Sequence, residues 1–323
     1  MNDNKQFDVL CAGAATWDTL LTGIDRDLMD TDSLLAEDCF AAAGGDAVNA
    51  AVSMAKLGMK TSISCVLGND SPARLVMEEL RRNGICTDDI HILEHAHTSS
   101  PVLLIDERGE RHIIRVPNSG NHFFTEDMIS DETLEKASHL HFASANVLKR
   151  MDGKPLGRLF ERAHAKGLTT SLDASYDKAK RGLEPVESAL WNCDIFFPSM
   201  QEAKIYAGSD DIDEINAFFE QFPLKIFGIK LGEKGVFVRD EKEKIFLDTL
   251  YHKTPVDTTG AGDAFLAGFT AAWLKGYDLK SCALCGSAQS ASVLDAIGAN
   301  TGAGTWTEAM NLIRAAGYEM QKR

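Results

Sequence analysis

An alanine between two glycines stands directly before an aspartate in the segment Gly260-Ala261-Gly262-Asp263. The residues that follow are mostly apolar up to Gly276, a pattern that predicts a helix beginning at this glycine-rich turn. The first backbone N–H groups of a helix have no intrahelical partner, and together with the helix dipole they form a site for an anion. The segment therefore predicts a phosphate-binding helix start.

Asp263 falls in the first turn of this predicted helix, beside the anion site. A carboxylate in that place repels a phosphate, but it becomes useful if it accepts a proton from a hydroxyl that attacks the phosphorus. Aspartate is also common in the first turn of helices as a cap. These four residues alone leave both interpretations open: a catalytic base and a helix cap.

A second polar group lies near the N-terminus, where Asp18 precedes the glycine pair Gly44-Gly45 and Asn49 follows it. The glycine pair permits a ligand to approach the backbone closely, and an Asn in the first turn of a helix can reach back over it. A tight strand-to-helix turn with a polar cap would use the same residues. The pattern is thus a candidate ligand site with a purely structural alternative.

Short apolar segments alternate with helical patterns along most of the chain. Repeated strand–helix–strand units predict an α/β fold with a mostly parallel sheet and helices on both faces. The predicted strands include 7–13, 61–68, 139–143, 169–173, 195–197 and 225–231, and the predicted helices include 44–57, 73–83, 156–166, 201–207 and 213–221.

Residues 98–118 interrupt this alternation with a hairpin pattern, in which two apolar runs flank Glu107-Arg108-Gly109-Glu110. Strand-like pieces also occur at about 14–22 and 34–43. We expect these pieces to form a small discontinuous sheet, inserted as a lid into a single domain of residues 1–323. Arg115 on the hairpin could close over a substrate, while His112 fits a solvated strand edge.

The string Asp-Thr-Thr-Gly-Ala-Gly-Asp-Ala-Phe at 257–265 resembles the C-terminal signature of the PfkB (ribokinase-like) family of carbohydrate and nucleoside kinases. The resemblance spans nearly the whole chain, through motifs in the family's order. It implies a ribokinase-like fold, with Asp263 as the catalytic base. It also implies that the amides of Gly260, Ala261 and Gly262 hold the charge that develops on the transferred phosphoryl group.

The resemblance assigns the N-terminal polar group to the hydroxyls of a sugar, through Asp18, Gly44, Gly45 and Asn49. Ribokinases proper carry a lysine after the glycine pair, whereas this chain has Asp46. Ser175 and Asp177 replace an Asn and an Arg that many relatives place near the phosphate path. These departures disfavour ribose, and they disfavour an acceptor that carries its own phosphate.

The middle of the chain resembles the family's nucleotide and magnesium elements. Glu202 matches the Glu of an Asn-x-x-Glu element in which Ser199 replaces the Asn, and this implies that Glu202 organises Mg²⁺ through water; a helix-capping box explains the same pair. Lys230, Gly232 and Gly235 resemble the nucleotide loop, although the family often has Thr or Ser where this chain has Lys230; a lysine there could meet phosphate, and a simple turn is the alternative. By the same resemblance, Asn300 lies near the nucleotide, and Asp257 and Thr259 lie where many relatives bind a monovalent cation such as K⁺.

Composition narrows the function further. The formal net charge of −15 argues against nucleic acid and against an anionic membrane as partners. No signal segment or membrane-length apolar run is present, so we expect a cytoplasmic protein. The seven cysteines are scattered among apolar neighbours, and Cys282-x-x-Cys285 lies in a helical stretch. Buried reduced thiols fit this pattern better than a redox or zinc site.

The resulting hypothesis is ATP- and Mg²⁺-dependent phosphorylation of a hydroxyl on a sugar or sugar-like molecule, with K⁺ left open. A nucleoside kinase of the same fold and a non-catalytic sugar or nucleotide sensor are the alternatives. A dehydrogenase-like enzyme is disfavoured because the chain has no G-x-G-x-x-G. Exposed apolar lid strands predict a homodimer formed through the lid. The identity of the acceptor stays open.

Overall fold

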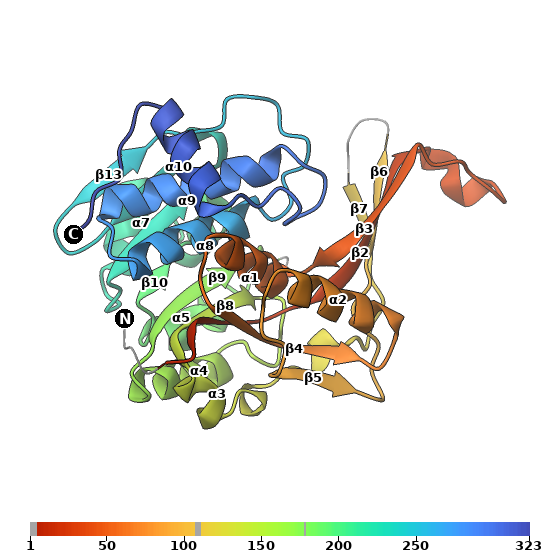
Figure 1. The fold of residues 1–323 in the computed structure, drawn as a ribbon, viewed down its shortest axis with the longest axis horizontal. Helices are drawn as coiled ribbons and strands as arrows, with labels where there is room; N and C mark the ends of the chain where they lie inside the picture. Colours follow the sequence, from red (N-terminus) through yellow and green to blue (C-terminus); the bar gives the residue numbers. More distant parts are fainter. Residues whose placement is uncertain (1–4, 107–110, 178) are drawn as a thin grey trace.

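Buried apolar runs form the strands of a large sheet in the computed structural model, which describes residues 5–106, 111–177 and 179–323 (Figure 1). Its strands are β1 (Phe7–Ala12), β4 (Thr61–Gly68), β5 (Ile90–Leu93), β8 (Ala137–Ala145), β9 (Thr169–Ala174), β10 (Ile195–Phe196), β11 (Ile226–Lys230), β12 (Val236–Arg239) and β13 (Lys244–Leu247). They lie in the order β13-β12-β11-β10-β9-β8-β1-β4-β5.

Every neighbouring pair from β5 to β11 is parallel, and the antiparallel pairs are β11–β12 and β12–β13, at one edge. Parallel strands share a direction, so their carboxyl ends meet at one edge of the sheet, where ligands of open α/β folds bind. The residues that follow β1, β8, β9 and β11 are thereby brought together although they lie far apart in the sequence.

Helices cover both faces of this sheet, as predicted (Figure 1). One face carries α1 (Asp46–Lys56), α2 (Ser71–Arg82), α8 (Ala261–Leu274), α9 (Leu279–Leu294) and α10 (Trp306–Ala315). The other face carries α3 (Asp131–Glu135), α4 (Lys154–Ala165), α5 (Glu184–Leu190), α6 (Met200–Ala207) and α7 (Ile212–Phe219). Four short 3-10 turns complete the set of described helices: η1 (Arg26–Asp30), η2 (Gly120–Phe123), η3 (Glu126–Met128) and η4 (Gly232–Lys234).

Strand β1 shows why the buried strands are continuous runs of apolar residues in the sequence. Val9 and Cys11 point into the core under α1 and α8, whereas Leu10 and Ala12 point into the core on the opposite face. Successive side chains of a strand alternate between faces, so a strand covered on both sides needs apolar residues at every position. All four residues are fully buried.

A separate small sheet contains β2 (Thr16–Ile24), β3 (Asp38–Gly44), β6 (Val102–Asp106) and β7 (Arg111–Ile114), in the order β3-β2-β6-β7. Strands β6 and β7 pair antiparallel, as the hairpin pattern predicts. The predicted turn at Glu107-Arg108-Gly109-Glu110 lies outside the described residues. Ile113, Ile114 and Val116 are 48%, 54% and 62% exposed, so apolar surface faces outward here.

All seven cysteines are unpaired, as expected, and five of them are buried, including Cys282 and Cys285 in α9; the expectation of buried thiols is wrong for Cys39, which is exposed, and for Cys86, which is partly buried. Over the described ranges, no group of three His, Cys, Asp or Glu side chains is arranged to hold a metal ion. Within that same part of the chain, no helix combines the length and apolar character needed to cross a membrane.

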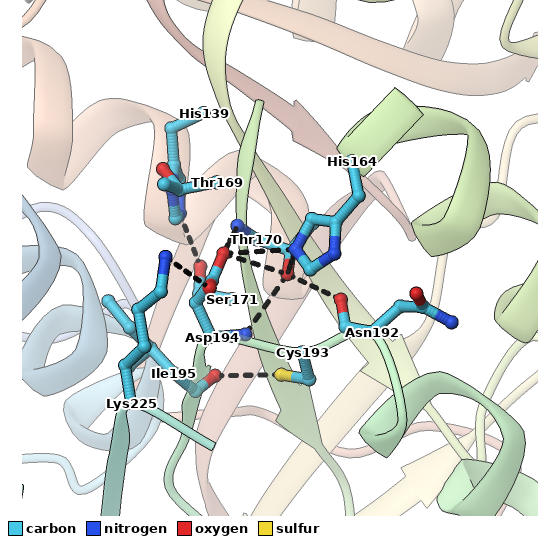
Figure 2. Close-up of polar contacts among 10 residues, drawn as sticks. All are labelled: His139, His164, Thr169, Thr170, Ser171, Asn192, Cys193, Asp194, Ile195 and Lys225. Carbon is cyan, nitrogen blue, oxygen red and sulfur yellow. Dashed lines mark hydrogen bonds and ion pairs between the residues drawn. The ribbon is translucent and has the colours of Figure 1, made fainter. Parts of the chain in front are cut away.

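A buried polar network ties the strands together at their amino ends, away from the edge described above (Figure 2). Asp194, just before β10, accepts hydrogen bonds from the Thr170 N–H at 2.8 Å and from His164 at 3.1 Å, and it pairs with Lys225 at 2.8 Å. Burial raises the pKa of Asp194, but these donors outweigh it and hold the pKa at about 2.

Asp194→Asn is expected to lower the free energy of unfolding at pH 7 by about 2 kcal/mol. Because the folded-state pKa is depressed, this stability is present above the unfolded pKa near 4 and is lost as the pH falls towards about 2. Urea unfolding at pH 7 and pH 3 measures the loss. Asp131→Asn is the matched control, since Asp131 also pairs with two cations but is 53% exposed; we expect it to cost much less stability, because water screens exposed ion pairs. Equal losses in the two variants would contradict the assignment.

Candidate active site

The predicted phosphate site is the start of α8. Its N-cap is Gly260, in the left-handed region at φ 77°, and no side chain caps the helix. A Cβ at Gly260 would lie 2.1 Å from the Ala299 carbonyl oxygen, so the turn admits only glycine. No side chain competes with an anion for the first amides of this 14-residue helix, although the Ala261 N–H makes a long hydrogen bond of 3.4 Å to the Thr258 carbonyl oxygen.

Asp263 lies in the first turn of α8 but does not cap the helix. Its Oδ2 instead accepts a hydrogen bond of 2.8 Å from Asn49 Nδ2, in the first turn of α1. Burial raises the pKa of Asp263 well above its ordinary value, and the charges of Asp46 and Asp173 add to the rise. Asn49 and Lys230 oppose it. A carboxylate with a raised pKa beside an anion site is suited to accepting a proton.

Asp18 of β2 lies against the glycine pair at the start of α1. A Cβ at Gly44 would lie 2.2 Å from Asp18 Oδ2, so the pair is what lets the carboxylate approach the backbone. Asp18 Oδ1 is buried and has no hydrogen-bond partner among the described residues. A buried acceptor without a donor fits a ligand hydroxyl. Arg115 follows β7, and its charge is close enough to lower the pKa of Asp18.

The pKa of Asp18 is raised to about 6, mainly by burial and further by Asp46. Asp18 therefore carries a charge above about pH 6 and is neutral below it. We expect the KM for the acceptor to rise as the pH falls below this value, because a neutral carboxyl is a weaker acceptor for hydroxyl donors. Steady-state kinetics from pH 5 to about pH 8 measure this. In Asp18→Asn the KM should be high throughout and independent of pH; a KM that still follows the pH in this variant would contradict the role.

Two of the residues that depart from the family pattern meet in space. Ser175, after β9, donates a hydrogen bond of 3.2 Å to Asp46 Oδ2 at the start of α1. Asp177, another departure, lies in a different cluster, where it pairs with Arg181 at 3.0 Å. Arg181 also pairs with Asp152 at 2.8 Å, so its charge is already balanced.

Lys230, at the end of β11, brings a cation to the start of α8. A Cβ at Gly262 would lie 3.2 Å from Lys230 Nζ, and Asp173 pairs with the same Nζ at 2.8 Å. Burial lowers the pKa of Lys230, but Asp173 and Glu202 outweigh it and raise the pKa, so the side chain is charged. The ammonium group lies where a phosphate at the helix start could meet it.

Ser199 and Glu202 form the capping box that was the alternative for this pair. The Ser199 N–H donates to Glu202 Oε2 at 2.7 Å, and the Glu202 N–H donates to Ser199 Oγ at 3.3 Å. Burial raises the pKa of Glu202, although Lys230 opposes the shift. The box brings the Glu202 carboxyl near Lys230.

A cavity of about 840 Å³ opens beside Lys230 and Gly262. Gly232 and Gly235 of the predicted nucleotide loop line it, bracketing η4. Sequence reasoning missed the opposite walls, which come from residues 249–255 and from α9. Those walls include Tyr251, His252, Ser287, Ala291 and Leu294. No motif marks these residues, because only the tertiary packing of α9 and of the 249–255 segment brings them to the cavity.

The last predicted residues lie outside this cavity's lining. Asn300 is buried beside Asn49 and donates to its Oδ1 at 2.8 Å. Asp257 Oδ1 accepts hydrogen bonds from the N–H and hydroxyl of Thr259 at 2.9 and 2.7 Å, and Asp257 Oδ2 accepts from the Gly298 N–H at 3.2 Å. The two residues therefore lie together, in a loop linked to the start of the 298–302 segment.

Several known proteins are similar to this chain. The family model for the pfkB family carbohydrate kinases matches residues 8–306. An ATP-dependent 6-phosphofructokinase of Thermoanaerobacterium thermosaccharolyticum is 26% identical over 302 residues, covering 92% of this chain and 91% of the relative. The structure of Arabidopsis thaliana ribokinase complexed with ribose and ATP is similar at TM-score 0.79 and 21% identity, with 95% and 98% coverage. A putative ribokinase II of E. coli in complex with ATP and Mg²⁺ gives TM-score 0.81 at 19% identity, with 95% and 99% coverage.

At such low identities the two structures show the fold, which is ribokinase-like as predicted. The family match is broader and spans most of the chain. The chain therefore belongs to the PfkB family of carbohydrate kinases.

Proposed function

We propose that this kinase transfers the γ-phosphoryl group of ATP to a hydroxyl of a sugar-like acceptor that carries no phosphate of its own. The observation that supports this most directly is the position of Asp263, in the first turn of the uncapped helix α8 and hydrogen-bonded to Asn49. One carboxylate thus lies between the anion site and the residues assigned to the acceptor.

In the proposed reaction the acceptor oxygen attacks the γ-phosphorus while its proton passes to Asp263. A new O–P bond forms, the bond to the β-phosphate oxygen breaks, and ADP leaves. The amides of Gly260, Ala261 and Gly262 stabilise the charge on the transferred group. Asp18, Gly44, Gly45 and Asn49 orient the acceptor.

The nucleotide is assigned to the 840 Å³ cavity, whose inner end reaches Lys230 and Gly262. Lys230 would contact the phosphates, and Glu202 would hold Mg²⁺ through water. Bound Mg²⁺ neutralises and aligns the phosphate oxygens. The oxygen-only chemistry of Glu202 suits that hard cation, and the E. coli relative named above was solved with ATP and Mg²⁺. Asp257 and Thr259 remain the proposed site of a monovalent cation.

An unphosphorylated acceptor is supported by the charges around Asp18. Asp46 places a carboxylate where ribokinases carry a lysine, and Ser175 holds it there. Arg181 is balanced by Asp152 and Asp177, and Lys230 by Asp173. Apart from Arg115, whose charge also reaches Asp18, a phosphate on the acceptor would therefore face carboxylates with little cationic charge to offset them.

The test is a panel of ketoses, aldoses, sugar acids, inositols, nucleosides and sugar phosphates, scored by acceptor-dependent ADP release with and without K⁺. We expect turnover with an unphosphorylated sugar or polyol. Turnover with nucleosides alone would select the nucleoside kinase alternative, and phosphoryl transfer to none of the acceptors would contradict the proposal.

The small sheet is proposed to act as a lid that excludes water during transfer. Its exposed residues Ile113, Ile114 and Val116 are proposed to pair with the lid of a second copy. Sedimentation velocity at micromolar concentration should then show a dimer, and a monomer alone would contradict the pairing.

A further inference from the structure

A chain of hydrogen bonds leads to Asp263 from a residue that lies outside the nucleotide cavity. Asn300 Nδ2 donates to the Ala43 carbonyl oxygen at 2.9 Å and to Asn49 Oδ1 at 2.8 Å. Asn49 Nδ2 then donates to Asp263 Oδ2 at 2.8 Å. The chain joins β3, the segment after α9, α1 and α8. Asn300 is 7% exposed and Asn49 is 4% exposed, so water does not compete for these bonds.

The direction of this chain is set by one backbone carbonyl. The Ala43 oxygen can only accept, so the atom of Asn300 next to it must be the amide nitrogen. The second hydrogen of that nitrogen needs an acceptor, which makes the facing atom of Asn49 the amide oxygen. Asn49 must then present its nitrogen to Asp263. The two orientations of the Asn49 amide, which are equivalent in shape, are therefore not equivalent in this protein.

We propose that Asn300 is a positioning residue for phosphoryl transfer: it holds the Asn49 amide so that a hydrogen-bond donor always faces Asp263 Oδ2. This inference rests on the proposed role of Asp263 as the base. With Oδ2 engaged, Oδ1 is the oxygen left to take the acceptor's proton. The second hydrogen of Asn49 Nδ2 is left for the acceptor.

The donor matters because the surroundings of Asp263 disfavour its charge. Asp46 from α1 and Asp173 from β9 face it with like charges, and burial acts in the same direction. Lys230 from β11 and the Asn49 donor act in the opposite direction. Since Lys230 is already paired with Asp173, the Asn49 amide is a substantial part of what opposes the rise in the pKa of Asp263.

Two substitutions separate this role from simple packing. Asn300→Asp places an acceptor beside the Ala43 oxygen and Asn49 Oδ1, so Asn49 should rotate its amide and turn its oxygen towards Asp263. Asn300→Leu has a similar shape but removes the restraint, so both amide orientations become accessible. Asn216→Asp is the matched control: Asn216 is 2% exposed and donates to Glu220 at 2.9 Å, but it lies in α7 on the other face of the sheet.

The first readout is the pH titration of the Asp263 carboxyl ¹³C signal, which is assigned by its absence from the spectrum of Asp263→Asn. We expect a pKa higher by about one unit in both Asn300 variants and unchanged in Asn216→Asp. The second readout is the acid limb of kcat/KM for the acceptor found in the panel. In both Asn300 variants this acid limb should move to higher pH by a similar amount, so that turnover at low pH falls about tenfold. The KM for MgATP should stay within about twofold.

Thermal unfolding shows whether each variant is folded, and Asn300→Leu carries the test if Asn300→Asp is not. An Asp263 pKa equal to that of the wild type in a folded Asn300→Leu protein overturns the proposal. If the wild type transfers no phosphoryl group but the ¹³C pKa rises as expected, the proposed function fails while the restraint on Asn49 stands.

Discussion

Asp263→Asn is expected to lower turnover by about 10²–10⁴-fold while the affinity for MgATP stays within about twofold. Asparagine keeps the shape and can still contact Asn49, but it cannot take the acceptor's proton. Turnover follows from acceptor-dependent ADP release, and MgATP affinity from calorimetry without acceptor. The exposed Asp210→Asn is the control and should leave both unchanged. Near-native turnover in Asp263→Asn would remove Asp263 as the base.

The same variant should also be more stable than the wild type at pH 7. The pKa of Asp263 is raised, so its ionised form costs folding free energy above the unfolded pKa near 4. Replacing it with a neutral amide removes the repulsion from Asp46 and Asp173. Urea unfolding should show a gain that shrinks as the pH is lowered towards 4. A variant that is less stable at pH 7 would contradict this electrostatic picture.

Gly260→Ala is expected to abolish the phosphate site. An alanine at φ 77° is strained, and its Cβ would lie 2.1 Å from the Ala299 oxygen, so the backbone at the start of α8 must move. We expect a loss of more than about 3 kcal/mol in unfolding free energy. Turnover should fall at least about 10²-fold, because the amides no longer face the phosphoryl group.

Gly276→Ala separates the two causes of this loss, which are backbone strain at a positive φ and the contact of the added Cβ with Ala299. Gly276 lies just beyond the other end of α8. Its φ is 80°, but no atom lies within 4 Å of the added Cβ. Only backbone strain remains, so we expect a loss of about 1 kcal/mol and unchanged turnover. Chemical unfolding measures the stability, and acceptor-dependent ADP release measures the turnover. Equal losses of stability in the two variants would show that the contact with Ala299 is not the cause.

These predictions share a physical basis in the sheet. Parallel strands carry Asp173 and Lys230 to one edge, and α1 and α8 begin at that same edge with Asp46 and Asp263. Several carboxylates and one lysine therefore share a small buried volume. Burial raises the pKa values of Asp18 and Asp263, and repulsion between the carboxylates adds to the rise. Both effects cost stability that the apolar cores on the two faces of the sheet must offset.

Local sequence was enough to predict the α/β architecture. Strands covered on both faces must be apolar at every position, and helices that pack on the sheet must carry apolar residues on the face that contacts it. It was also enough to locate the start of α8, since a glycine-rich turn before an apolar run is typical of the beginning of a helix. Shorter elements were missed: β5, with partly exposed positions, and the short helices α3 and α5 carry little periodic signal. Helix α10 was also missed, although its capping box was present in the sequence.

The relations between distant residues were decided by the tertiary structure. Asp263 and Asn49 are 214 residues apart, and nothing in either local pattern predicts the hydrogen bond between them. The same holds for Asn300, which resemblance placed near the nucleotide and folding placed behind Asn49. Motifs are read from local backbone chemistry, whereas the pKa of a carboxylate and the direction of an amide depend on whichever groups packing brings to it. The sequence by itself therefore determined the fold and predicted that the chemistry takes place at the start of α8, and only the packed structure decided how Asp263 is held there.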